Sequence, residues 1–257
     1  MRSIWSGSIN FGLVNIPVKL YTAVKDNHLH LNYLRRQDLC PIGYKKVCRQ
    51  TGEEVPKEDI VRGYQYEKGD YVVLSDNDFA SADIEKTYSI TVEDFVLEKE
   101  IDLKYAEKPY YLEPEKSGMK VYALFRETLI ESKMVGIGKF VLKEREHLVM
   151  LKSQGSVILL ELLRYHDEIL DISELHLPEK TKIPKNQIDL ALELIEKLSG
   201  PFDPNKYSDT YTDKLKQIVN AKKKGKRTAV KGAKVRRTTV VPDIVSRLKE
   251  SLALSHR

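Results

Sequence analysis

The chain has 257 residues, of which 43 are basic, 38 are acidic and 41% are hydrophobic. This is the composition of an ordinary soluble globular protein, and the length suffices to bury a core without disulfides or a structural metal. No apolar run approaches the ~20 residues that span a membrane, and the N-terminal residues lack the apolar segment of a secretory signal. Two cysteines do not make a disulfide framework. We therefore expect a protein of the reducing cytoplasm with no membrane partner.

The net charge of +5 hides a strong asymmetry along the chain. The segment from Lys222 to Arg257 holds twelve basic residues against two acidic ones, a net charge of +10, which leaves the rest of the chain at −5. A basic tail on an acidic body is typical of proteins that bind polyanions, most often nucleic acid. The alternative is a basic tail that only aids solubility.

Short apolar runs at regular spacing dominate the first two thirds of the chain. The stretch 9–21 is apolar and β-branched, with interruptions at Gly12 and Pro17. Residues 88–96 alternate, which predicts a strand with Tyr88, Ile90 and Val92 on one face. Further strands are expected at 71–74, 138–142, 148–151 and 157–163. Many short strands separated by turn residues are typical of a β-sandwich or β-barrel.

Helical spacing interrupts the strands and takes over after them. Apolar side chains recur at helical intervals in residues 119–132 and 188–198, and the second run stops at Ser-Gly-Pro (199–201). Residues 205–221 carry a narrower apolar stripe, which suits packing against a partner. The sequence as a whole predicts a mainly β chain of the α+β class.

The C-terminal segment has two parts. Residues 222–239 are almost all Lys, Arg, Gly, Ala and Thr, a composition that cannot bury enough apolar surface to fold alone. Pro242 and Asp243 then suit a helix start. Apolar residues follow at steps of four, three and four: Val241, Val245, Leu248 and Leu252. We interpret this amphipathic helix as a docking peptide for a partner protein. The alternative is a helix that folds back on the body.

Motifs for catalysis or metal binding are weak. Seven residues separate Cys40 from Cys48, with His28 and His30 upstream, and this is not the spacing of a zinc ribbon. Glu161, Asp167 and Glu168 could hold Mg²⁺ as in a nuclease, but no spacing signature supports this, and a solvated strand end is the favoured interpretation. We expect no metal, no cofactor and no catalytic residues.

Basic residues of the body gather at expected turns. Arg35 and Arg36 form one group, and Lys143 with Arg145 forms another. A third group comprises Lys45, Lys46 and Arg49. Turns at the rim of a barrel can meet a phosphate backbone, and ordinary solvated surface is the alternative for each group.

One long segment, from Arg2 to Tyr21, is followed in order by 44–48, 52–55, 59–64, 69–73 and 108–114 and the helix after it. These segments resemble those of prokaryotic Ku proteins closely, and the resemblance covers roughly residues 1–220. Ordered segments of this length are far more specific than any short motif in the chain.

The resemblance implies a β-barrel core with an inserted dimerisation arm and C-terminal helices. It further implies a ring-shaped homodimer that threads onto the ends of double-stranded DNA without catalysis, in association with the nucleoid, and that engages an ATP-dependent end-joining DNA ligase through its C-terminal region. The division expected on this basis is 1–183 for the barrel with its arm, 184–221 for a helical arm, and 222–257 for the basic tail with its terminal helix.

Site residues follow from turn position together with the resemblance. We expect the bore of the ring to be lined by Lys45, Lys46, Arg49, Lys143 and Arg145. The tail residues expected to add non-specific DNA affinity are Lys222, Lys223, Lys224, Lys226, Arg227, Lys231, Lys234, Arg236 and Arg237. The residues expected to dock the ligase are Val241, Val245, Leu248 and Leu252, although Pro242 and Arg247 depart from the more apolar terminal segment of the family.

Three other functions fit parts of the sequence. A nucleoid-associated protein would coat circular and linear DNA equally well. A nuclease or phosphotransferase built on Glu161 and Asp167 would give a Mg²⁺-dependent product. A scaffold for proteins alone would not bind DNA even at low salt.

Overall fold

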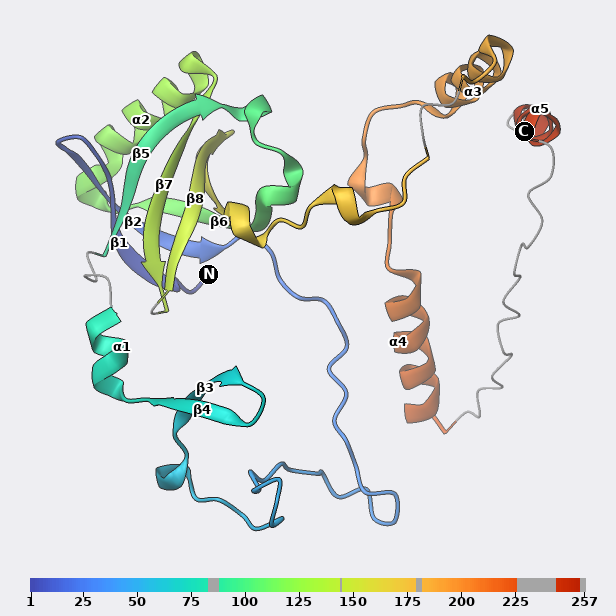
Figure 1. Cartoon of the computed structure of the whole chain (residues 1–257). Coiled ribbons are helices and arrows are strands. Elements are labelled where there is room, and N and C mark those ends of the chain that lie inside the picture. Colours follow the sequence, from blue (N-terminus) through green and yellow to red (C-terminus); the bar gives the residue numbers. More distant parts are fainter. Residues whose placement is uncertain (83–87, 144, 179–181, 226–243, 255–257) are drawn as a thin grey trace. The chain divides into compact units, whose positions relative to one another are not determined.

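A computed structural model of the chain describes residues 1–82, 88–143, 145–178, 182–225 and 244–254 (Figure 1). The chain divides into two compact units, 1–171 and 172–257. The first unit contains a β-barrel and a long insertion, and the second carries the C-terminal helices. The finer division expected from the sequence, at 183 and 221, stays a prediction.

The first unit is built around a closed barrel of seven strands. These are β1 (Trp5–Phe11), β2 (Val14–Thr22), β5 (Ser89–Leu97), β6 (Ala106–Pro114), β7 (Met134–Leu142), β8 (Arg145–Gln154) and β9 (Val157–Leu163). Around the barrel they follow the order β1-β2-β6-β9-β8-β7-β5. All neighbouring pairs are antiparallel except β1 and β5, which pair in parallel and close the barrel. The expected α+β fold with a β-barrel core is confirmed.

Alternation along the strands fills the barrel interior. On β2, Ile16, Val18 and Leu20 are fully buried while the residues between them face outward, and Pro17 does not end the strand. The run 9–21 is two strands rather than one, because Gly12 adopts a φ of +56° and turns the chain between β1 and β2. The pleat thus delivers every second side chain to one core.

Helix α2 (Met119–Ser132) packs on this core and matches the helix predicted for 119–132. Phe125 stacks on Phe11 of β1 with ring centroids 4.7 Å apart. The buried Tyr122 hydroxyl donates to the Leu112 carbonyl at 2.6 Å and accepts from the Ile158 amide at 2.7 Å. One phenol therefore ties α2 to β6 and β9.

The start of β5 differs from the predicted alternation. Ile90 and Val92 are buried as expected, but Tyr88 is 64% exposed and has a φ of +44°. The reason is the close approach of β1, because the Ser8 amide donates to the Tyr88 carbonyl at 3.0 Å. Gly7 makes this approach possible, since a Cβ there would lie 2.0 Å from the Tyr88 oxygen.

The insertion between β2 and β5, called the arm here, spans residues 23–88. It contains 3₁₀-helix η1 (Lys57–Asp59), a two-stranded hairpin of β3 (Arg62–Glu67) and β4 (Asp70–Leu74), and α1 (Asp76–Ala82). None of the arm side chains that the structure describes is buried. Apart from the barrel bonds at its two ends, Ala23 and Tyr88, the described arm therefore has no buried side chain to anchor it.

The second unit carries α3 (Lys185–Leu198), α4 (Thr210–Lys223) and α5 (Ile244–Leu254). They correspond to the three helices predicted for this region, with α4 starting later because Asp209 caps it by accepting from the Tyr211 and Thr212 amides. The remaining 3₁₀-helices of the chain are η2 (Glu98–Glu100), η3 (Leu103–Tyr105), η4 (Lys116–Gly118), η5 (His166–Glu168), η6 (Ile172–Glu174) and η7 (Pro204–Lys206). None of the helices described is both long enough and apolar enough to cross a membrane.

Replacing Gly7 with Ala tests the barrel closure. The new Cβ would overlap the Tyr88 carbonyl and the Trp5 ring, so we expect a loss of about 1–3 kcal/mol in the free energy of unfolding, measured by urea denaturation. Gly43→Ala is the matched control, because a Cβ at that arm position meets no atom within 4 Å. Equal stability of the two variants would contradict the described β1–β5 seam.

Candidate nucleic-acid interface

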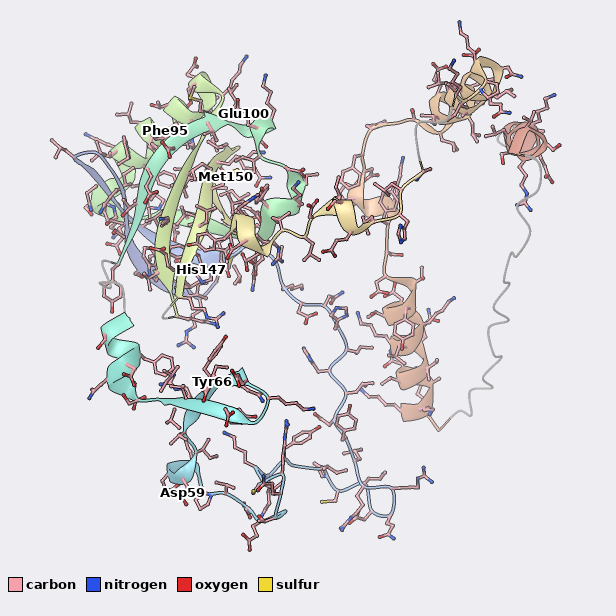
Figure 2. The ribbon with its side chains drawn as sticks, in the orientation of Figure 1. Asp59, Tyr66, Phe95, Glu100, His147 and Met150 are labelled. Carbon is pink, nitrogen blue, oxygen red and sulfur yellow. The ribbon has the colours of Figure 1, made fainter. Side chains whose placement is uncertain are left out.

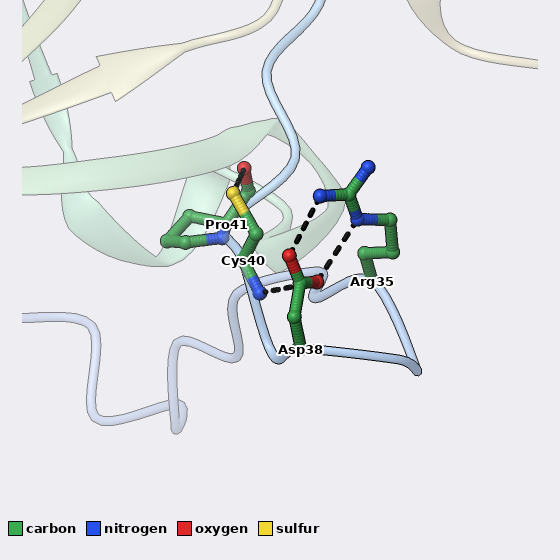
Figure 3. A network of polar contacts seen from close by, with 4 residues as sticks. All are labelled: Arg35, Asp38, Cys40 and Pro41. Atoms are coloured by element: carbon green, nitrogen blue, oxygen red, sulfur yellow. Dashed lines mark hydrogen bonds and ion pairs between the residues drawn. The ribbon is translucent and has the colours of Figure 1, made fainter.

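The first basic turn of the arm is tied together by Asp38. Its carboxylate accepts from Arg35 Nε at 2.9 Å and from Arg35 Nη2 at 2.6 Å, and the Cys40 amide lies 3.3 Å from Oδ1 (Figure 3). The Arg35 guanidinium and the Cys40 amide hold the pKa of Asp38 below its usual range. Arg35 is therefore engaged within its own turn.

A second turn with the same backbone pattern follows. In the first turn the Leu39 amide donates to the Arg35 carbonyl at 2.8 Å, and in the second the Gly52 amide donates to the Cys48 carbonyl at 2.9 Å. Leu39 and Gly52 both adopt left-handed φ values, 59° and 75°. The two turns, 35–40 and 48–53, thus have the same backbone hydrogen-bonding pattern. Their side chains differ, so the sequence does not show this repeat.

The equivalent positions do not form a metal site. Where the second turn has Cys48 and Thr51, the first has the ion pair of Arg35 and Asp38. Backbone amides of Thr51 and Gln50 lower the pKa of the Cys48 thiol, whereas Cys40 places its sulfur 3.7 Å from the neighbouring Pro41 carbonyl. Among the described residues, no three His, Cys, Asp or Glu side chains are placed to hold a metal ion.

The three expected DNA contacts of the arm differ in their surroundings. Lys45 Nζ lies 2.5 Å from Glu54, so its charge is already partnered. Lys46 and Arg49 are exposed, and no carboxylate in the described part of the chain is within ion-pair distance of either. Lys46 and Arg49 are the better candidates for contact with phosphate.

Lys143 and Arg145 lie together at the tight connection between β7 and β8. Lys143 adopts a left-handed φ of 52°, and Arg145 is the first residue of β8, paired with Leu142. Both side chains are exposed, and neither has an ion-pair partner among the residues described. This hairpin end therefore presents two cations on a rigid strand pair.

Elsewhere on the barrel, four outward-facing cations are paired with carboxylates. Lys19 pairs with Glu115 at 3.9 Å, Lys139 with Glu93 at 3.9 Å, and Arg164 with Glu107 at 4.0 Å. Lys152 is likewise paired with Glu98. Exposed pairs of this kind contribute little to stability, but they offset four of the positive charges on the barrel wall.

The basic tail begins at the end of α4. Lys222 and Lys223 form the last turn of that helix and Lys224 is its C-cap, and all three are exposed. The other predicted tail contacts lie outside the described residues: Lys226, Arg227, Lys231, Lys234, Arg236 and Arg237.

The predicted ligase-docking residues belong to α5. Val245 and Leu248 are half-buried. Val241 and the side chain of Leu252 lie outside the described residues. The helix predicted to start near Pro242 and Asp243 is present, with Ile244–Leu254 as its described bounds.

The carboxylates weighed as a nuclease site differ in their surroundings. Glu161 sits on β9 opposite Met150 of β8, and partial burial raises the pKa of its carboxyl. Glu168 accepts from the Tyr165 amide at 2.8 Å, and Asp167 lies beside it in η5. These three carboxylates are not gathered into a metal-holding group.

One surface escapes sequence analysis. The β3–β4 hairpin exposes Tyr64 (67%), Tyr66 (57%) and Tyr71 (59%), together with Val72 and Val73. Figure 2 shows Tyr66 projecting from the hairpin. The apolar run at 71–74 is visible in the sequence and predicts a strand. That no described residue covers this strand is seen only in the structure. An exposed apolar patch of this kind marks a site of association.

Comparison with known proteins identifies the family. Residues 10–190 match the model of the Ku70/Ku80 beta-barrel domain. The chain belongs to the Ku family. It is 42% identical to the Non-homologous end joining protein Ku of Opitutus terrae, over 98% of this chain and 91% of that protein. It is 37% identical to the proteins of the same name from Bacillus subtilis and Pseudomonas syringae pv. tomato, which it matches over 100% and 98% of its own length and 83% and 87% of theirs. The resemblance seen in the sequence is confirmed.

Asp38→Asn tests the first turn of the arm. The amide removes the charge that holds Arg35, so we expect several-fold faster tryptic cleavage after Arg35 and Arg36, quantified by mass spectrometry at neutral pH. Because the pKa of Asp38 is lowered in the folded chain, its contribution is present at neutral pH and is lost only as the pH falls through that lowered value. Asp59→Asn, also in the exposed arm, is the control, and equal cleavage of both variants would contradict the proposed tie.

Proposed function

We propose that this protein binds the ends of double-stranded DNA without regard to sequence, as a ring-shaped homodimer, and recruits an ATP-dependent DNA ligase in non-homologous end joining. It acts in the cytoplasm at the nucleoid and performs no catalysis itself. The observation that carries the proposal is identity of 37–42% over nearly the whole chain with relatives named for this pathway.

The arm supports the homodimer. A two-stranded hairpin is only marginally stable alone in water, and here its tyrosines and valines are exposed. A second copy of the arm supplies a matching apolar surface, because a twofold contact places the same patch on both partners. Two arms that meet in this way enclose an opening that DNA enters only from an end.

The distribution of charge supports binding to the phosphate backbone rather than to bases. Four cations lie in or beside turns and are free of ion pairs within the described chain, whereas four cations of the barrel wall are paired with carboxylates. The free cations are Lys46, Arg49, Lys143 and Arg145. Phosphate contacts carry no sequence information, so selectivity for ends comes from topology. Few cations also permit sliding, because uniform phosphate contacts have no preferred register.

The C-terminal region supports recruitment. Helix α5 is amphipathic, and residues 224–243 separate it from α4. Short amphipathic helices on linkers bind grooves of partner proteins through anchors at helical spacing, which Val245 and Leu248 provide. We assign ligase docking to this helix and added non-specific DNA affinity to the basic residues between 222 and 237.

A competition experiment tests end binding. A labelled linear duplex of about 40 base pairs is bound at ~150 mM salt, where weak non-specific binding is suppressed. We expect linear plasmid to compete in proportion to its ends, and closed circles or hairpin-blocked plasmid to fail. Equal competition by circles would refute threading and make the basic tail the main DNA-binding element.

Neutralising the free cations tests the site. We expect Lys46→Gln with Arg49→Gln, and separately Lys143→Gln with Arg145→Gln, to weaken DNA binding. The slope of log affinity against log salt should fall by about 0.9 for each phosphate that the variant no longer neutralises. The control carries Lys139→Gln and Lys152→Gln, which removes two cations already paired with glutamates. Slopes equal to that of the control would remove the tested pair from the interface.

A further inference from the structure

Helix α3 carries an apolar face that its own unit covers only in part. Ile188, Leu192 and Ile195 follow one another at steps of four and three, so they share one side of the helix. They remain 43%, 50% and 58% exposed. Such a stripe on a helix requires a partner, because it has no other means of leaving water.

The residue that reaches this face comes from the C-terminal helix. Leu248 of α5 lines a hollow of about 540 Å³ whose other walls are Ile183, Gln187, Ile188, Ala191, Leu192 and Ile195. Figure 1 shows α3 and α5 side by side, and the two helices are in contact within the second unit. The hollow is almost entirely apolar, as the seat of an amphipathic helix should be.

We propose that α3 is a helix-binding surface whose occupant is α5 of the same chain, and that the seated helix withholds Leu248 from the ligase. The second half rests on the ligase-docking role given to α5 under the proposed function. The first half concerns only the pairing of α3 with α5. The C-terminal helix is then a latch, closed on its own chain and opened by a partner.

The tether favours the same chain over a second copy. Twenty residues, 224–243, connect α4 to α5, and an extended chain of that length reaches at most about 70 Å. A covalent connection of this length raises the local concentration of α5 near α3 above that of a separate copy. The net charges of the two helices are opposite but small, since α3 carries three acidic residues against Lys185 and Lys197, and α5 carries two basic residues against Glu250.

The partial cover explains how the latch can open. With α5 in place, the α3 stripe is still about half exposed, so the contact buries a limited area. The covalent connection of α5 to the same chain, rather than a large buried area, then keeps α5 on α3. A partner with a deeper groove would bury Val245 and Leu248 more fully and would displace α3.

Site-specific photo-crosslinking in the full-length chain tests the pairing. Benzoylphenylalanine replaces Leu248 in one sample and the exposed Lys249 in another, and the crosslinked peptides are mapped by mass spectrometry. We expect crosslinks from position 248, and not from 249, to residues 183–195. Leu192→Glu should lower their yield at least fivefold, whereas Asn186→Glu, at an exposed α3 position outside the hollow, should leave it unchanged.

A mixture of ¹⁵N-labelled and unlabelled chains identifies the occupant. Crosslinks within one isotope only support the latch, and mixed-isotope crosslinks to α3 would overturn it in favour of exchange between copies. Crosslinks that fall elsewhere, or that form equally from position 249, would also overturn it. Neither DNA nor ligase is present, so this outcome is independent of end binding, and a failure of ligase recruitment would leave the crosslink intact.

Discussion

The parallel pairing of β1 with β5 is the constraint on which the first unit depends. It is the single parallel seam in the barrel, and its first bond joins the Ser8 amide to the Tyr88 carbonyl, where the arm ends. The other root of the arm is held as well, because the Ala23 amide donates to the Pro109 carbonyl of β6 at 3.3 Å. Barrel closure and the anchoring of the whole insertion, 23–88, are therefore one structural event. Gly7 serves both, since any side chain there would separate the strands and displace the arm.

The arm departs from the usual rule that apolar residues of a folded chain are buried. It holds many apolar residues, yet none of its described side chains is buried in the single chain. Hydrogen-bonded turns and one hairpin give it local form, while the described chain provides no buried core for it. Such a segment gains stability from any partner that binds its folded form. The same exposure leaves Lys46 and Arg49 without internal partners among the residues described.

Much of the fold can be predicted from the sequence because its signals are local. The helix at 119–132 and the strand at 157–163 have the predicted bounds, since apolar periodicity determines both. The strands β6 and β3 are not predicted from the sequence. β6 contains Pro109 and Pro114, which are uncommon in strands, and β3 has no buried residue to produce an alternating apolar pattern. The predicted face of Tyr88 is wrong because its left-handed φ depends on β1, a strand far earlier in the chain. Of the site, the cations can be named from their turns, but the pairing of Lys45 with Glu54 depends on a bridge that periodicity does not show.

The candidate site residues of the barrel and arm differ from those of the C-terminal region in how charge and apolar surface are arranged. On the barrel and arm, some cations are paired, as Lys139 is with Glu93, and others are free, as Arg145 is at the start of β8. In the C-terminal region the cations are many, and among the described residues Leu248 is the α5 anchor that has a seat. Binding of a polyanion by many cations does not require a precise arrangement of side chains, because its free energy comes mainly from counterion release. The apolar contact does need geometry, and α3 supplies it within the same unit. The basic residues and the helix are therefore separate features of the C-terminal region, and under the proposed function the first hold DNA while the second docks the partner.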